Sequence, residues 1–298
     1  MKVLITGSNG QLGKSLITNK PKDFVLIQCS RENLDLSNKN ECKKFIFENN
    51  PDWLINCGAY TNVEKAEEEK ELAFRINRDA PKAFSEALRD IGGKIIHIST
   101  DYVFDGYKNL PYTPCDKKNP INAYGESKAA GEDEIVSILK EKNSSIIIRT
   151  SWLIGPYGNN FSNKILKLNS EKKSLNIVSD QISSPTSSLD LSNVIWGILK
   201  QFSENNICLD MPKIMHFSNK GAASWYDLAK KIIEISYANK IINKKSKILS
   251  ISSKDLNTLA KRPAYSKLDC EETYNLLNLN TSSWQDCIRC YMKYLYNC

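Results

Sequence analysis

The chain opens with Met1-Lys2-Val3-Leu4-Ile5-Thr6-Gly7-Ser8-Asn9-Gly10-Gln11-Leu12-Gly13. Its apolar start, Met1–Ile5, predicts a buried strand. A G-x-x-G-x-x-G turn follows, made of Gly7, Gly10 and Gly13, and the segment 14–18 can open a helix. Glycines allow a backbone to turn tightly and approach a ligand closely, and a helix N-terminus presents free N–H groups to a pyrophosphate. The stretch therefore favours a dinucleotide-binding fold over a turn that only joins a strand to a helix.

Strand and helix patterns alternate through the first half of the chain. Apolar strand patterns occupy 24–29, 52–57, 94–98 and 145–149, and helical patterns occupy 38–49, 64–71, 73–87 and 129–142. This alternation predicts an α/β protein with a doubly wound parallel sheet of the Rossmann type. The alternation loosens after Gly155–Gly158, where we expect a second, smaller α/β lobe to begin. From there the sequence predicts helices at 161–169, 188–202, 225–237 and 281–295, strands at 176–178 and 213–217, and a loop at 261–268.

The composition excludes several classes of protein. Of the 298 residues, 41% are hydrophobic and 25% are charged, as in ordinary globular proteins. The formal net charge is +7, but acidic residues lie between the lysines, so we expect no nucleic-acid partner. The sequence has no signal-peptide pattern and no apolar run near the ~20 residues that span a bilayer, which predicts a cytoplasmic protein without a membrane partner. The nine cysteines include a single C-x-x-C, at Cys287–Cys290, and predict neither a disulfide scaffold nor a metal site.

A candidate proton donor lies in the stretch Ala123–Lys128. Tyr124 and Lys128 stand four residues apart, so on a helix their side chains leave the same face. An ammonium fixed beside a phenol favours the phenolate and lowers the phenol pKa from its usual value of about 10. The tyrosine then becomes a usable acid near neutral pH. The alternative is that Tyr124 and Lys128 are surface residues on a solvated helix face. The other motifs of the chain favour the role of Tyr124 as a proton donor.

The end of the second predicted strand carries a cofactor signal. In dinucleotide-binding folds this end meets the adenosine ribose, where an acidic residue suits NAD and an arginine suits the 2′-phosphate of NADP. Here the strand ends in Cys29-Ser30-Arg31, with no acidic residue before Glu32. The pattern favours NADP(H); the alternative is that Arg31 is simply a surface residue.

The strand at 94–98 carries a substrate signal. It ends in Ser99-Thr100-Asp101. A hydroxyl at the carboxyl end of a strand points into the ligand crevice of an open parallel sheet. Ser99 or Thr100 is therefore a candidate partner for a substrate carbonyl group.

In this order, these landmarks resemble the extended short-chain dehydrogenase/reductase superfamily and, within it, the dTDP-4-dehydrorhamnose reductase family. The matching motifs run through nearly the whole chain: Ile5-Thr6-Gly7 through Gly13, Ala59-Tyr60-Thr61, Ser99-Thr100-Asp101 through Gly106, Tyr124-x-x-x-Lys128, Arg149-Thr150-Ser151-Trp152, Asp180-Gln181 through Thr186, and Arg262-Pro263-x-x-Ser266-x-Leu268.

The resemblance implies a cofactor domain formed by 1–155 and about 186–220, and a nucleotide-sugar-binding lobe formed by about 156–185 and 221–298. It implies cofactor contacts from Gly7, Gly10, Gln11, Leu12, Gly13, Ser30, Arg31, Asp35, Leu36, Ala59, Tyr60, Thr61, Asn77, Tyr124 and Lys128. It implies substrate contacts from Thr100, Asp101, Val103, Trp152 and Arg262, and catalytic roles for Tyr124, Lys128 and Thr100.

The implied activity is the NADPH-dependent reduction of the C4 ketone of dTDP-4-dehydro-β-L-rhamnose to dTDP-L-rhamnose. Tyr124 would protonate the forming alkoxide, Thr100 would donate a hydrogen bond to the same oxygen, and Lys128 would bridge the nicotinamide ribose and keep Tyr124 acidic. NADH in place of NADPH, and a monomer or a homodimer, stay open. The alternatives are a reductase of another nucleotide-linked 4-keto-deoxysugar, or a non-catalytic regulatory subunit of the methionine adenosyltransferase type. The three catalytic side chains favour an enzyme.

One departure from the family pattern concerns a metal ion. Some members place acidic residues just after the glycine turn for Mg²⁺ at a dimer contact, whereas this chain has Lys14-Ser15 there. We therefore expect turnover to be the same in EDTA and in added Mg²⁺, as measured by NADPH oxidation. Activity that disappears in EDTA and returns only with Mg²⁺ would contradict the inference from these two positions.

Overall fold

The computed structural model describes residues 1–204 and 211–296. Its centre is a six-stranded sheet in the order β10-β5-β4-β3-β1-β2, in which every neighbouring pair is parallel. The strands are β1 (Lys2–Thr6), β2 (Val25–Cys29), β3 (Trp53–Asn56), β4 (Lys94–Thr100), β5 (Ser145–Thr150) and β10 (Ile214–His216). From β1 the chain first adds β2 on one side of β1 and then adds β3, β4 and β5 in turn on the other side. The direction in which strands are added therefore reverses between β1 and β3. In open α/β sheets a ligand binds at the carboxyl ends of the strands beside such a reversal.

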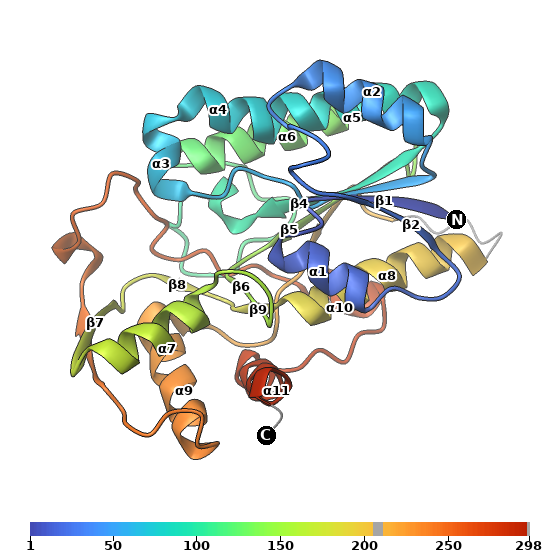
Figure 1. Cartoon of the computed structure of the whole chain (residues 1–298). Helices are drawn as coiled ribbons and strands as arrows, with labels where there is room; N and C mark the ends of the chain where they lie inside the picture. The colour runs from blue at the N-terminus through green and yellow to red at the C-terminus, as the bar shows by residue number, and fades with distance from the viewer. Residues whose placement is uncertain (205–210, 297–298) are drawn as a thin grey trace.

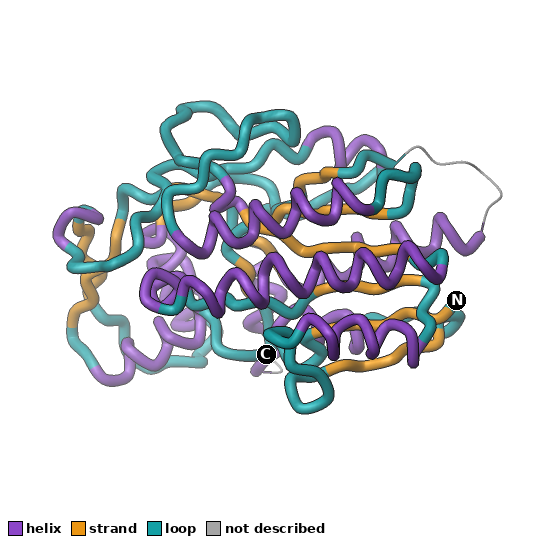
Figure 2. The backbone as a smooth tube through the Cα atoms, turned by 90° about the horizontal axis from the view of Figure 1, so that it is seen from above, coloured by secondary structure: helices purple, strands orange, loops and turns teal. Residues whose placement is uncertain are grey.

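Helices cover both faces of this sheet, as the doubly wound pattern predicts (Figure 1). One face carries α2 (Lys39–Asn49), α5 (Ala80–Ile91) and α6 (Ala123–Ile138), which run alongside the strands when seen from above (Figure 2). The other face carries α1 (Gln11–Thr18) and α8 (Ser188–Glu204), which pack against each other. Both faces of the central strands are therefore buried, and β3 and β5 contain no exposed residue.

The side chains of each strand alternate between two cores. In β3, Leu54 joins the core under α2, α5 and α6, and Trp53 and Ile55 join the core under α8. Burying a side chain of this size is worth roughly 1.5–3 kcal/mol relative to leaving it exposed. The period of two along each strand thus fixes which side chains face which helix layer.

A smaller lobe lies beside the carboxyl ends of the strands (Figure 1). Its strands β7 (Ser174–Val178) and β12 (Lys247–Ile251) pair in parallel, and its helices are α7 (Phe161–Glu171), α9 (Trp225–Ala238) and α11 (Trp284–Tyr296). These elements share a separate core that includes Ile165, Leu228 and Ile288. Four two-residue strands complete the lobe: β6 (Leu153–Ile154), β8 (Ile182–Ser183), β9 (Thr186–Ser187) and β11 (Ala223–Ser224).

The structure differs from the sequence-based expectations in several places. The helix expected at 129–142 begins earlier, at Ala123, because the Asn122 side chain caps it by accepting from the Gly125 N–H, and it ends at Ile138. The helix expected at 73–87 is interrupted: α4 (Lys70–Phe74) and α5 are joined by a π-helical turn at Arg75–Asp79. The run expected at 64–71 divides at Glu69, between α3 (Val63–Glu68) and α4. The strand β12 and the short helix α10 (Glu271–Leu276) were not expected at all.

The boundary between the lobes also differs from the expected one. Leu268, Cys270 and Tyr274 lie in the segment that the sequence places in the smaller lobe, yet they pack into the core of the large sheet. No helix in the described part of the chain is long and apolar enough to cross a membrane.

A buried ion pair fixes α6 on the sheet. Glu132 of α6 and Arg149 of β5 are both almost fully buried, and two hydrogen bonds join them, at 2.9 Å from Nε and 2.7 Å from Nη2. The Ser99 hydroxyl donates a third hydrogen bond to the same carboxylate, at 2.5 Å. Arg149 holds the pKa of the Glu132 carboxyl below its usual value although burial alone would raise it. An arginine left alone at this place would be a buried, uncompensated charge.

We therefore expect Glu132→Gln to lower the free energy of unfolding by about 3–5 kcal/mol, the usual cost of removing one partner of a buried pair. Urea denaturation measures it. The control is Glu134→Gln on the same helix, whose ion pair with Lys82 is partly exposed on both sides and should be worth no more than about 1 kcal/mol. Equal losses in the two variants would show that the buried pair does not anchor α6.

Candidate active site

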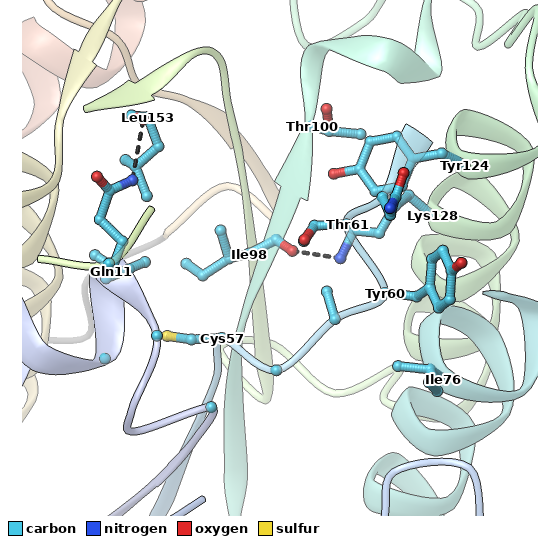
Figure 3. Close-up of a pocket in the computed structure, with 18 of the residues that line it drawn as sticks. Gln11, Cys57, Tyr60, Thr61, Ile76, Ile98, Thr100, Tyr124, Lys128 and Leu153 are labelled. Atoms are coloured by element: carbon cyan, nitrogen blue, oxygen red, sulfur yellow. Dashed lines mark hydrogen bonds between the residues drawn. The ribbon is translucent and has the colours of Figure 1, made fainter. Parts of the chain in front are cut away.

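A cavity of about 1130 Å³ opens at the carboxyl ends of β1, β3 and β4, against the smaller lobe. Its wall combines the glycine turn after β1, the loop after β3, the end of β4 and the start of α6 (Figure 3). A single small ligand usually occupies about 300–1,000 Å³. This cavity is larger than that range, which suits an extended ligand such as a dinucleotide.

The glycine turn is shaped to hold a phosphate group. Gly7 has a φ of +65°, in the left-handed region that glycine adopts without strain. A Cβ atom on Gly13 would lie 2.3 Å from the Gly7 carbonyl oxygen, so only glycine allows this close turn. No side chain caps the N-terminus of α1 at Gly10. The uncapped helix end, with its positive dipole, fits a pyrophosphate, and the turn therefore has the features needed for a dinucleotide.

The end of β2 forms the far side of the cavity. Ser30, Arg31, Asp35 and Leu36 all line it, as the sequence suggests. The N–H and the hydroxyl of Ser37 hold the pKa of the Asp35 carboxyl below its usual value, and the nearby charges of Arg31 and Arg75 lower it further. Arg31 is exposed and so available to a phosphate.

The loop Ala59–Thr61 lines the cavity, but Asn77 does not. Asn77 is buried behind the loop, in the π-helical turn. Its amide oxygen accepts from the Tyr60 N–H at 2.8 Å, and its amide nitrogen donates to the Tyr60 carbonyl at 3.0 Å and to the Ser127 hydroxyl at 3.0 Å. The sequence suggested a cofactor contact for Asn77, and the structure instead shows a clamp on the backbone of the loop.

Tyr124 and Thr100 meet inside the cavity (Figure 3). Burial raises the pKa of the Tyr124 phenol to about 12, although its hydrogen bond with Thr100 acts in the opposite direction. The sequence predicts a lowered pKa, set by Lys128, and this prediction is wrong for the structure. Burial is the largest cause of the raised pKa, and the Lys128 ammonium does not offset it because it points away from the phenol.

Lys128 points to the floor of the cavity. Its Nζ donates to the Ile98 carbonyl at 2.6 Å (Figure 3). The same Nζ lies 3.1 Å from Nε2 of His97. Burial lowers the pKa of the Lys128 ammonium to about 8, and the charge of Glu132 partly opposes the shift. His97 is buried too, which holds its pKa well below the usual value and keeps it neutral. Sequence analysis missed His97, because nothing local distinguishes it from a histidine buried for packing.

Asp101 lies at the deep end of the cavity, and three hydroxyl groups already occupy its carboxylate. Ser266 donates to it at 2.5 Å, Ser183 at 3.2 Å and Thr100 at 3.1 Å. Burial raises the pKa of Asp101 to about 6. Asp101 therefore joins Thr100 to two segments of the smaller lobe. The substrate contact predicted for Asp101 stays a prediction, since Asp101 also lines the cavity. Val103, another predicted substrate contact, is completely buried and does not line the cavity.

An aromatic wall faces the cavity from the smaller lobe. Trp152 and Trp225 are stacked, with ring centroids 3.6 Å apart and planes within 10°, and Phe161 packs on Trp225 at 4.6 Å. All three line the cavity, as does Arg262, which forms an ion pair with Glu64. Trp152 and Arg262 were predicted from the sequence, whereas Trp225 and Phe161 were not. Their helices meet Trp152 only in the folded chain, so no local signal marks them.

Comparisons with known proteins identify relatives over nearly the whole chain. The family model described as RmlD substrate binding domain matches residues 1–297. The chain is similar to the dTDP-4-dehydrorhamnose reductase of Aggregatibacter actinomycetemcomitans, with 37% identity over 97% of each chain. It is 35% identical to the protein of the same name from Sinorhizobium fredii, over 97% of this chain and 96% of that one. The crystal structure of dTDP-4-dehydrorhamnose reductase from Bacillus anthracis in complex with NADP has a TM-score of 0.87 and 35% identity, over 98% of this chain and 99% of that one.

The position of Arg31 generates a prediction about cofactor choice. Arg31→Ala should weaken NADPH binding by about 10- to 100-fold and leave NADH binding unchanged, because a charge-assisted hydrogen bond to a phosphate is worth about 1.5–3 kcal/mol. Fluorescence titration with each nucleotide measures both dissociation constants. Arg75→Ala is the matched control, since Arg75 also acts on Asp35 but does not line this cavity. An equal loss for NADPH and NADH in Arg31→Ala would remove Arg31 from phosphate recognition.

Proposed function

The chain belongs to the RmlD substrate binding domain family, and on this premise we propose that it reduces the C4 ketone of dTDP-4-dehydro-β-L-rhamnose with NADPH, giving dTDP-L-rhamnose. The single observation that carries the proposal is the meeting of Tyr124, Thr100 and Lys128 in one cavity with the glycine turn. A proton donor, a hydroxyl and a buried ammonium then lie beside a dinucleotide cradle. This is the set of groups that a ketone reduction requires.

Protonation of the ketone oxygen is assigned to Tyr124. NADPH, when bound, supplies the hydride that the carbonyl carbon accepts. The phenol of Tyr124 then donates its proton to the oxygen, which becomes a hydroxyl group. A phenol pKa of about 12 still permits the transfer, because an alkoxide is a stronger base than a phenolate. The ammonium of Lys128, held by the Ile98 carbonyl one helical turn from Tyr124, would bind the nicotinamide ribose of the cofactor, as the family resemblance implies.

Thr100 has a single proton to donate, and in this structure it goes to Asp101. We infer that Thr100 either accepts from Tyr124 while it is held by Asp101, or turns from Asp101 to donate to the ketone oxygen. In both cases its main effect is to orient the reacting groups. The loss caused by Thr100→Val is therefore expected to be smaller than that caused by Tyr124→Phe.

The nucleotide of the substrate is assigned to the smaller lobe. The stacked pair Trp152 and Trp225 offers an aromatic face for a base. Arg262 offers a planar cation for a diphosphate, once it exchanges its partner Glu64 for the ligand. We therefore infer that the base and the diphosphate bind between this wall and Tyr124, which brings the sugar next to the phenol.

The assay that tests the proposal is NADPH oxidation with enzymatically prepared dTDP-4-dehydro-β-L-rhamnose. Tyr124→Phe should lower kcat by about 10²–10⁴-fold, the usual contribution of a general acid, with the NADPH dissociation constant nearly unchanged. Tyr112→Phe is the control, because its buried hydroxyl bonds Asp105 outside the cavity and turnover should change little.

Three outcomes would contradict the assignment. Near-full turnover in Tyr124→Phe would mean that another group delivers the proton. Faster turnover of a different nucleotide-linked 4-keto-deoxysugar would show that the proposed substrate is wrong, while the proposed ketone reduction would stand. No turnover of any such sugar, together with a co-purifying methionine adenosyltransferase, would indicate a regulatory subunit.

A further inference from the structure

A row of polar side chains crosses the apolar sheet directly beneath Lys128. Thr6 of β1, Asn56 of β3 and His97 of β4 are register partners on adjacent parallel strands, so their side chains leave the same face of the sheet. Each is only 1% exposed. The Thr6 hydroxyl donates to Oδ1 of Asn56 at 2.6 Å, and Nδ2 of Asn56 lies 2.9 Å from Nδ1 of His97. Nε2 of His97 lies 3.1 Å from Nζ of Lys128.

This row reaches the cofactor side of the cavity at its far end. The Thr6 hydroxyl accepts from the Gly58 N–H at 3.2 Å, and Thr6 itself lines the cavity next to the glycine turn. Burying three polar side chains within a sheet is costly unless every donor and acceptor is paired. Each side chain of the row lies within hydrogen-bond distance of the next, and the row connects the ammonium with the place where the glycine turn begins.

The directions of these hydrogen bonds depend on the charge of Lys128. A neutral imidazole has one N–H and one bare nitrogen. If Lys128 is an ammonium it donates to Nε2, so the proton must sit on Nδ1. The Asn56 amide must then turn over to present its oxygen to Nδ1 and its NH₂ group to Thr6, because the structure has Nδ2 facing Nδ1. If Lys128 is a neutral amine, it can accept from an Nε2–H, and the Asn56 NH₂ group then donates to Nδ1 in the orientation that the structure has. The assignment of amide atoms and of the histidine tautomer is open to measurement.

The other titratable groups around Lys128 do not accept a hydrogen bond from its ammonium. Glu132, on the same helix, is held by two hydrogen bonds to Arg149 and one from Ser99. Cys57, after β3, has its thiol pKa raised by burial and is therefore neutral. Tyr124 is a neutral phenol for the same reason. The direct acceptors of the ammonium are the Ile98 carbonyl and the bare nitrogen of His97.

We propose that His97 is a positioning residue that holds Lys128 as an ammonium by accepting a hydrogen bond from it at Nε2. Nδ1–H then donates to the oxygen of a turned Asn56 amide, whose NH₂ group donates to the Thr6 hydroxyl. The row thereby fixes both the charge and the position of Lys128. Its link to catalysis rests on the proposed function, but the tautomer and its coupling to Lys128 do not.

The direct test is ¹⁵N NMR of the full-length protein with labelled histidine. The chain has only two histidines, so His216→Gln assigns the signals. At pH 6.5–7, His97 should show a protonated Nδ1 and a bare Nε2. As the pH rises through the Lys128 pKa of about 8, the Nε2 signal should shift, and the shift should disappear in Lys128→Met. A protonated Nε2 at pH 6.5 in the native protein, or a titration that persists in Lys128→Met, would overturn the proposal whatever the substrate proves to be.

The kinetic test uses the pH profile of kcat/KM. His97→Leu removes the acceptor and should move the alkaline limb to lower pH by about one unit, since the ammonium loses a charge-assisted hydrogen bond. His97→Gln, whose amide oxygen can still accept, should restore most of the shift. His216→Gln is the matched control: His216 is equally buried in the same sheet but faces Arg149, and it should leave the limb in place. If His97→Leu folds and the alkaline limb of its pH profile does not move, the proposal is contradicted. If His97→Leu does not fold, the NMR measurement on the native protein tests the proposal instead.

Discussion

The ion pair between Glu132 and Arg149 is the interaction on which the site depends. Tyr124, Lys128 and Glu132 stand at intervals of four residues on α6, so they share one face of the helix. The carboxylate at one end of this face is fixed to β5 and to Ser99 of β4. Because the helix is rigid, fixing Glu132 also fixes the ammonium one turn away and the phenol two turns away. The charge pair thus sets the register between the helix and the strand that ends in Thr100.

Close packing holds the same helix from other sides. A Cβ atom on Gly125 would lie 2.2 Å from the Tyr102 carbonyl oxygen, and one on Gly131 would lie 2.1 Å from the Asn77 carbonyl oxygen. Both glycines therefore let α6 contact neighbouring backbone directly. Across the cavity, Asp101 connects Thr100 with Ser183 and Ser266, and Glu64 connects α3 with Arg262. The smaller lobe is thus joined to Thr100 by the buried carboxylate of Asp101 and to α3 by a partly exposed ion pair.

The sequence predicts those features whose cause is local. The glycine turn, the apolar strands and the spacing of Tyr124 and Lys128 each depend on a few consecutive residues, and the structure contains them. The direction of the Lys128 ammonium is different, because it depends on His97 and Ile98, about thirty residues away in sequence. The stacking of Trp152 on Trp225 likewise joins segments that only the tertiary fold brings together. Asn77 shows the opposite error: its polar side chain suggested a ligand, but in the fold its hydrogen bonds are made to protein atoms.

The clamp by Asn77 has a consequence for how this cavity tolerates sequence change. Both hydrogen bonds from its amide to Tyr60 go to main-chain atoms, so they hold the path of the loop Ala59–Thr61 as a neighbouring strand would. A main-chain bond does not depend on the side chain that the residue carries. Substitutions at positions 59 to 61 can therefore alter the shape and polarity of the cavity wall while the loop keeps its course. In this part of the protein, ligand preference and backbone geometry are encoded at separate positions, and each can be altered without the other.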